Sequence, residues 1–223
     1  MLSNETKTTV CNRALMLIGE DTINSITDND TKAARVCSQY YDLALQTVLE
    51  SGKWPFAIIE KPVTQVSLDP QTKEQKYAYQ IPTDCALIIG LSRRFNRKQM
   101  KKGIDWDIRY IPSLGYKVIV CNLESKTDEE ITEEIEQDEQ ILIEYVADTG
   151  NTNSYTAAFV RCLVAQLAVD ICMPITHDMQ KFTGLVQYAE QLKTKALLQS
   201  LNEDGQDKMF WVDPLSASRE GVI

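Results

Sequence analysis

Residues 33–57 read AARVCSQYYDLALQTVLESGKWPFA, and the change of pattern within this stretch decides the fold. Apolar side chains recur at helical spacing from Ala33 to Val48, which predicts an amphipathic helix. Gly52 and Pro55 end this helix, because proline disfavours helical backbone in the residue before it. After Phe56 the helical period is lost, so this stretch marks the passage from helix to another kind of structure.

The section after Phe56 consists of short and often alternating apolar segments, separated by Pro, Gly, Asp and Asn. This pattern predicts an antiparallel β domain of five or six strands, at residues 57–66, 76–81, 86–92, 105–111, 116–121 and 140–147. The Pro-Ser-Leu-Gly sequence at 112–115 predicts a hairpin connection between two of them.

Helical spacing occurs in three further places. Residues 8–18 carry a stripe that includes Leu17 and precedes Gly19. A long stripe follows a cap at Asn153 or Ser154 and is expected to break at Pro174. The last helix follows Asp178, carries Val186 and Tyr188 in its stripe and ends near Leu201, while Asp28–Asp30 are expected to cap the helix of the opening stretch.

Neither pair of helices can bury its apolar face alone, so we expect all four to pack together. The predicted fold class is α+β, with an antiparallel four-helix bundle formed by residues 1–57 and 148–204. An antiparallel β domain, residues 58–147, is inserted between the two halves of the bundle. Residues 205–223 have no period and are predicted to form an extended C-terminal arm.

The composition is typical of a soluble globular protein, with 43% hydrophobic and 25% charged residues in 223. The net charge of −9 argues against a protein whose main task is to grip nucleic-acid phosphates. One basic cluster has no aromatic stacking motif beside it, so we expect a solvated loop or a partner contact in preference to nucleic-acid binding. It contains Arg93, Arg94, Arg97, Lys98, Lys101 and Lys102.

Targeting signals and metal motifs are not found in the sequence. No run of about 18 apolar residues occurs, so no membrane-spanning segment is predicted. The polar start of the chain lacks a signal-peptide pattern, which predicts a protein made and kept in the cytosol. No two cysteines form a C-x-x-C pair, which predicts reduced core thiols and no metal site. The six are Cys11, Cys37, Cys85, Cys121, Cys162 and Cys172.

Catalytic motifs are equally scarce, since neither a phosphate-binding glycine loop nor a G-x-S-x-G elbow is present. The single histidine, His177, suits a structural or capping position better than a general base. We therefore expect no catalytic, cofactor-binding or metal-binding residues. The enzyme-class alternative is a tail-associated polysaccharide hydrolase with paired carboxylates, for which Asp105, Asp107 and Glu144 are the first candidates. An α+β binding module of unrelated function is a third possibility.

Several segments, in their order and spacing, resemble the tail tubular protein A family, the adaptor rings of short-tailed phages. The resemblance covers most of the chain, and none of its motifs is catalytic. The chain departs from the family in its acidic segment Glu124–Glu139. The segments that carry the resemblance are CNRAL at 11–15, LIGE at 17–20, INSITD at 23–28, AARVC at 33–37, YYD at 40–42, WPFA at 54–57, YAYQIPTDC at 77–85 and the C-terminal helical pair.

The resemblance implies a virion protein without enzymatic activity, in a homo-oligomeric ring that is typically a dodecamer. The ring would lie between the portal and the tail nozzle, with genomic DNA passing through it without specific binding and no membrane as partner. The arm is expected to dock on the portal, unless its aromatic pair folds back on its own bundle; its contact residues would be Met209, Phe210, Trp211, Val212, Pro214 and Leu215. The acidic segment is expected to be a solvated loop or a short exposed helix. The sharper hypothesis is that some of its residues face the lumen, where they would repel DNA; these are Glu129, Glu130, Glu133 and Glu134.

Overall fold

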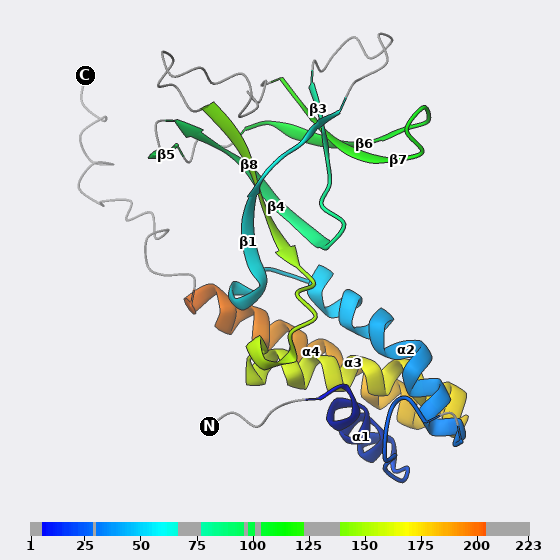
Figure 1. The fold of residues 1–223 in the computed structure, drawn as a ribbon. Coiled ribbons are helices and arrows are strands. Elements are labelled where there is room, and N and C mark those ends of the chain that lie inside the picture. Colours follow the sequence, from blue (N-terminus) through cyan, green and yellow to red (C-terminus); the bar gives the residue numbers. More distant parts are fainter. Residues whose placement is uncertain are drawn as a thin grey trace, which may run out of the picture.

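The computed structural model describes residues 6–28, 30–66, 77–95, 98–100, 104–122 and 139–203, with backbone alone for 93–95, 98–100, 139–140 and 200–203. Within these residues the fold is mixed α+β, with four α-helices and two antiparallel sheets. The helices gather at one end of the molecule and the strands at the other (Figure 1). The helical elements are α1 (Lys7–Ile18), α2 (Lys32–Glu50), α3 (Ala157–Thr176), α4 (Met179–Glu203) and the short 3-10 helices η1 (Pro55–Ala57) and η3 (Thr152–Ser154).

Threonine side chains begin the first two helices. Thr6 and Thr9 form a reciprocal capping box, in which the Thr6 hydroxyl accepts from the Thr9 amide at 3.1 Å and the Thr9 hydroxyl from the Thr6 amide at 2.7 Å. Thr31 caps α2 through its hydroxyl. The predicted cap within Asp28–Asp30 is wrong, because Thr31 lies next to the first helical turn and supplies the same acceptor.

Helix α3 differs from its prediction at both ends. Thr156 caps it, whereas Asn153 and Ser154 belong to η3. Pro174 does not break the helix, because a proline in the last turn removes only one backbone hydrogen bond before the helix ends. His177 then stops α3 in the left-handed conformation, with φ of 54°. This is a structural position for the histidine.

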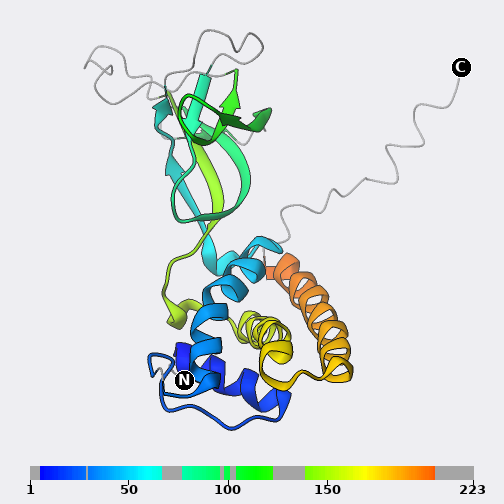
Figure 2. The same cartoon turned by 90° about the vertical axis from the view of Figure 1, so that its right-hand side faces the viewer.

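Helix α3 lies between the other helices, with α2 on one side of it and α4 on the other (Figure 2). Its buried side chains, among them Phe159, Leu163 and Ile171, join one hydrophobic core with residues of α1, α2 and α4. Lys181 of α4 fastens the end of α1, because its ammonium donates to the Ile18 carbonyl at 3.0 Å. Burial of this core is the main stabilising contribution to the helical end.

By length and composition alone, α3 is apolar enough to cross a membrane, although the sequence contains no uninterrupted apolar run of that length. More than half of the segment is buried inside the protein. The central helix of a packed core has the same composition, so this property gives no location for the protein.

Eight strands are present among the described residues, more than the five or six predicted. The predicted strand at 57–66 divides in two, and β5 is an additional short strand that pairs with β4. The sheets have the orders β1-β8-β4-β5 and β2-β3-β7-β6, with antiparallel pairing throughout. The strands are β1 (Ile58–Pro62), β2 (Gln65–Val66), β3 (Tyr77–Gln80), β4 (Cys85–Phe95), β5 (Lys98–Met100), β6 (Trp106–Ile111), β7 (Tyr116–Cys121) and β8 (Glu139–Ala147).

The two sheets share a hydrophobic core. Tyr79 and Ile119 from one sheet pack in the same cluster as Leu91, Ile143 and Tyr145 from the other. The predicted hairpin at 112–115 connects β6 and β7, which pair along their whole length. Five cysteines are buried and Cys85 is half-buried, and all six are free thiols, which confirms that most cysteines lie in the core.

An aromatic cluster lies where the chain passes from the helices to the strands and back. Phe159 of α3 is edge-on to Trp54, Phe56 and Tyr155, with ring centroids 4.9, 4.9 and 4.8 Å apart. The Trp54 indole N–H donates to the Val48 carbonyl at 2.8 Å, which ties the passage to the end of α2. Both chain crossings are therefore fixed by one set of rings.

Candidate functional site

Most exposed apolar side chains of the described surface are on the helices. A second, smaller group lies on the β6–β7 hairpin, at Ile108, Tyr110 and Tyr116. Exposure of apolar side chains to water is unfavourable, and a group of them on the surface is a candidate for contact with a partner. The helical group is therefore the first candidate for a contact surface; it contains Met16, Leu17, Leu43, Met179, Val186, Tyr188 and Leu198.

An apolar hollow of this group lies over α3, between α1 and α4, and is called the α1/α4 groove below. It has a volume of about 430 Å³. Met16 is 67% exposed and Tyr188 44%, so both side chains are available to a partner. The groove is lined by Arg13, Met16, Leu17, Val160, Arg161, Val164 and Tyr188.

Helical spacing explains why these side chains meet. Arg13, Met16 and Leu17 are three and four residues apart and share one face of α1. On α3, Arg161 is exposed while its neighbours Val160 and Val164 are buried and form the floor. The result is an apolar surface with two guanidinium groups. Such a surface suits a partner that offers an apolar side chain next to a carboxylate.

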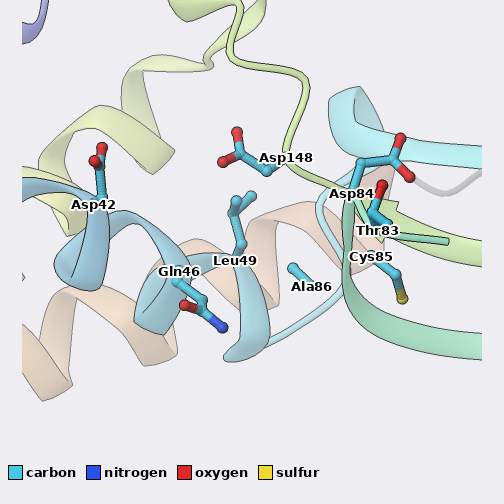
Figure 3. A pocket seen from close by; sticks show the side chains of 8 residues that line it. All are labelled: Asp42, Gln46, Leu49, Thr83, Asp84, Cys85, Ala86 and Asp148. Atoms are coloured by element: carbon cyan, nitrogen blue, oxygen red, sulfur yellow. The ribbon is translucent and has the colours of Figure 1, made fainter. Parts of the chain in front are cut away.

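A second hollow, also of about 430 Å³, lies at the junction of α2 with the strands (Figure 3). Its lining includes three carboxylates, and Asp148 points toward the side of the hollow where Asp42 lies, whereas the Asp84 carboxylate is turned the other way (Figure 3). The lining residues are Asp42, Gln46, Leu49, Thr83, Asp84, Cys85, Ala86 and Asp148.

Each of these three carboxylates has its own local partner. Asp42 pairs with the Lys7 ammonium at 3.0 Å, and Asp148 accepts from the Gly150 amide at 3.0 Å. Asp84 accepts from the Lys61 ammonium at 3.0 Å and from the Tyr145 hydroxyl at 2.9 Å. Across the described part of the chain, no group of three His, Cys, Asp or Glu side chains is arranged to hold a metal ion.

The electrostatics of the junction hollow favour structure over chemistry. Partial burial pushes the pKa of Asp84 upward, but the hydrogen bonds from Lys61 and Tyr145 outweigh it and hold the pKa below its usual value. Burial, with a smaller effect of Asp84, raises the pKa of the Cys85 thiol to about 11. A thiol with this pKa stays protonated near neutral pH and is a poor nucleophile.

The structure divides the carboxylates suggested for a hydrolase between the two sheets. Asp105 precedes β6 and Asp107 lies on it, at the end of one sheet order, whereas Glu144 lies on β8 of the other sheet. Asp107 accepts from the Arg109 guanidinium at 3.4 Å. Glu144 is directly opposite Glu60 in the β1–β8 register, a pair that the sequence analysis did not single out. Neither glutamate lines either of the two hollows.

The predicted partner-binding residues of the arm, Met209 to Leu215, lie outside the described residues, as do the predicted lumen-facing Glu129, Glu130, Glu133 and Glu134. In the basic cluster, Arg97, Lys101 and Lys102 also lie outside them. Arg93, Arg94 and Lys98 are on β4 and β5, where the backbone alone is described.

The α1/α4 groove was not found from the sequence. Leu17, Val186 and Tyr188 belong to the apolar stripes of helices that are expected to pack together, but all three side chains are exposed. A signal was present in α1, where Met16, Leu17 and Ile18 are consecutive. Successive helical residues are about 100° apart, so three apolar neighbours extend beyond one buried face.

No protein-family model matches this sequence, and the search of curated proteins found no match.

Proposed function

We propose that this chain is a structural subunit, without enzymatic activity, of a head-to-tail adaptor ring in a short-tailed phage virion. The observation that carries the proposal is the α1/α4 groove, an apolar surface with two arginines on the helical end of the protein. Exposed apolar patches with charged rims are typical of protein–protein contacts. The resemblance of the ordered sequence segments to the tail tubular protein A family supplies the kind of assembly.

The finer architecture belongs to the same proposal. Residues 1–57 and 148–204 form an antiparallel four-helix bundle, residues 58–147 an inserted β domain, and residues 205–223 an arm. One hydrophobic core shared by the four helices supports the first assignment. The aromatic cluster around Phe159, at both chain crossings, supports an insertion that begins and ends at one place.

The arm is proposed to dock on the portal. Burying Phe210 and Trp211, about 150–250 Å² each at about 25 cal/mol/Å², stabilises the contact by about 4–6 kcal/mol per aromatic side chain. Ordering the backbone costs about 1–2 kcal/mol per residue, so one arm binds weakly and many arms on one ring bind firmly. Deletion of residues 205–223 should abolish portal binding and leave the helical circular-dichroism signal unchanged. Portal binding at full strength after the deletion would remove the arm from the proposal.

The acidic segment is proposed to face the lumen, at Glu129, Glu130, Glu133 and Glu134. Like charges repel, so an acidic lining lets DNA slide through without being gripped. Replacing these glutamates with lysine should slow DNA ejection from assembled particles. Ejection at the normal rate in that variant would contradict a lumenal position.

No observation favours the alternative of a polysaccharide hydrolase with paired carboxylates. Such an enzyme needs a carboxyl group of raised pKa in a cleft. The described carboxyl group whose pKa is raised, chiefly by burial, is Asp170, and it lies within α3, hydrogen-bonded to Gln166 at 3.1 Å. This environment supports a role for Asp170 in the packing of the helices.

The proposal is tested by negative-stain imaging of the purified chain mixed with a portal from a short-tailed phage. We expect rings that cap the portal coaxially. Portal particles that are identical with and without the chain would overturn the adaptor assignment.

A further inference from the structure

Helix α2 lies on the side of the helical end away from α4 (Figure 2), and one of its faces carries exposed side chains. Leu43 is 54% exposed at its middle, although it is a large apolar side chain. Asp42 and Gln46 are exposed beside it, and Glu50 lies one turn further on. This face, called the α2 ridge below, therefore presents an apolar side chain among carboxylates.

The α2 ridge and the α1/α4 groove have complementary chemistry. The groove offers apolar side chains from Met16, Leu17 and Tyr188 together with the guanidinium of Arg161. The ridge offers Leu43 together with the carboxylates of Asp42 and Glu50. Asp42 is already paired with Lys7, but both side chains of that pair are half-exposed or more, and a carboxylate accepts more than one donor.

We propose that the α1/α4 groove of one subunit receives the α2 ridge of a second copy of this chain. The inference rests on the proposed ring function and names the lateral contact that would build it. Because groove and ridge are different surfaces on opposite sides of α3, the contact is heterologous and repeats from copy to copy. A repeated contact of this kind closes into a ring when its rotation allows.

Like-with-like contacts are disfavoured by charge. A groove facing a groove brings Arg161 of both copies together, and a ridge facing a ridge does the same for Glu50, whereas the charge of Asp42 is offset by Lys7. Like charges placed opposite each other across an interface oppose binding. Arg35 lies about two turns before Asp42 on α2 and takes part in an interaction within its own subunit.

The test uses two variants, each with one damaged surface. Leu43→Asp damages the ridge and Tyr188→Asp damages the groove, and both positions are exposed, so both variants should fold. Each variant alone should fail to form rings. Mixed together, they retain one intact ridge and one intact groove. They should therefore form a heterodimer of twice the 25.3 kDa chain mass and nothing larger, as measured by mass photometry.

Tyr110→Asp is the matched control, because Tyr110 is 61% exposed but lies on β6, away from the helices. It should assemble as the unmodified chain does. Circular dichroism of every variant checks that the helical content is retained. Arg161→Glu should weaken assembly at least tenfold, because it places like charges opposite each other.

The outcomes separate this inference from the proposed function. Rings of normal size from both single variants, or a mixture that gives no heterodimer, would overturn the groove–ridge contact and leave the adaptor proposal standing. If the unmodified chain does not associate, alone or with a portal, both the contact and the ring function are wrong.

Discussion

Replacing Phe159 with alanine tests whether the aromatic cluster holds the helices and strands together. Phe159 is fully buried and its ring contacts Trp54, Phe56 and Tyr155 at 4.8–4.9 Å. Truncation of a buried phenylalanine to alanine costs about 3–5 kcal/mol, because transfer free energy is lost and a cavity remains. The three edge contacts, at about 0.5–1.5 kcal/mol each, place this site toward the upper end of that range.

Urea unfolding followed by far-ultraviolet circular dichroism measures this loss. A domain of ordinary stability, about 5–15 kcal/mol, would lose a large fraction of its unfolding free energy. Tyr110→Ala, at an exposed strand position, is the control and should change the unfolding free energy by less than about 0.5 kcal/mol. A loss below about 1 kcal/mol for Phe159→Ala would refute the packed cluster, because removal of a well-packed buried ring lowers the unfolding free energy by more than this.

Three further predictions concern buried or paired polar groups. Asp170→Asn should raise the unfolding free energy at neutral pH by about 1 kcal/mol, because burial raises the pKa of Asp170 and opposes its charge. In thermal melts this gain should fade as the pH falls toward the ordinary pKa of 3.8. A gain that persists at that pH would contradict the reasoning. Tyr41→Phe should be neutral or stabilising by up to about 1 kcal/mol, because the buried Tyr41 hydroxyl has no partner among the described residues. Tyr145→Phe should destabilise the protein by about 1 kcal/mol, because it removes the hydrogen bond to Asp84. Equal effects of the two variants in urea titrations would argue against this distinction. Asp84 has a lowered pKa, so its stabilising contribution is present above its pKa of 3.8 in the unfolded chain and is lost as the pH falls through its pKa in the folded protein. Asp84→Asn should therefore reduce the loss of stability at acid pH. An unchanged loss would exclude this carboxylate as its source.

The sequence predicted the secondary-structure elements well, because apolar periodicity follows burial. The opening stretch forms α2, and Cys37, Ala44 and Val48 on its stripe are buried as expected. Ile23, in the loop after α1, is buried, and its backbone exchanges two hydrogen bonds with the Asn12 side chain. The element boundaries were less accurate, since Thr31 and Thr156 took the capping roles assigned to neighbouring polar residues.

The candidate contact surface could not be predicted in the same way. Apolar side chains that are exposed in one copy, such as Leu17 and Tyr188, have the same spacing as buried ones. Helical periodicity identifies the residues that share one face of a helix, but whether that face is buried depends on which element packs against it. The division into two sheets was also missed, because it depends on a break near Val63, where β1 leaves β8 and β2 turns to pair with β3.

The central claim, that this chain works by assembling, is tested most directly by mass photometry of the purified protein with and without a portal. The account predicts that portal particles gain about a dozen chain masses, as expected for one closed adaptor ring. A species that stays at the 25.3 kDa of a single chain and leaves the mass of the portal unchanged would contradict it.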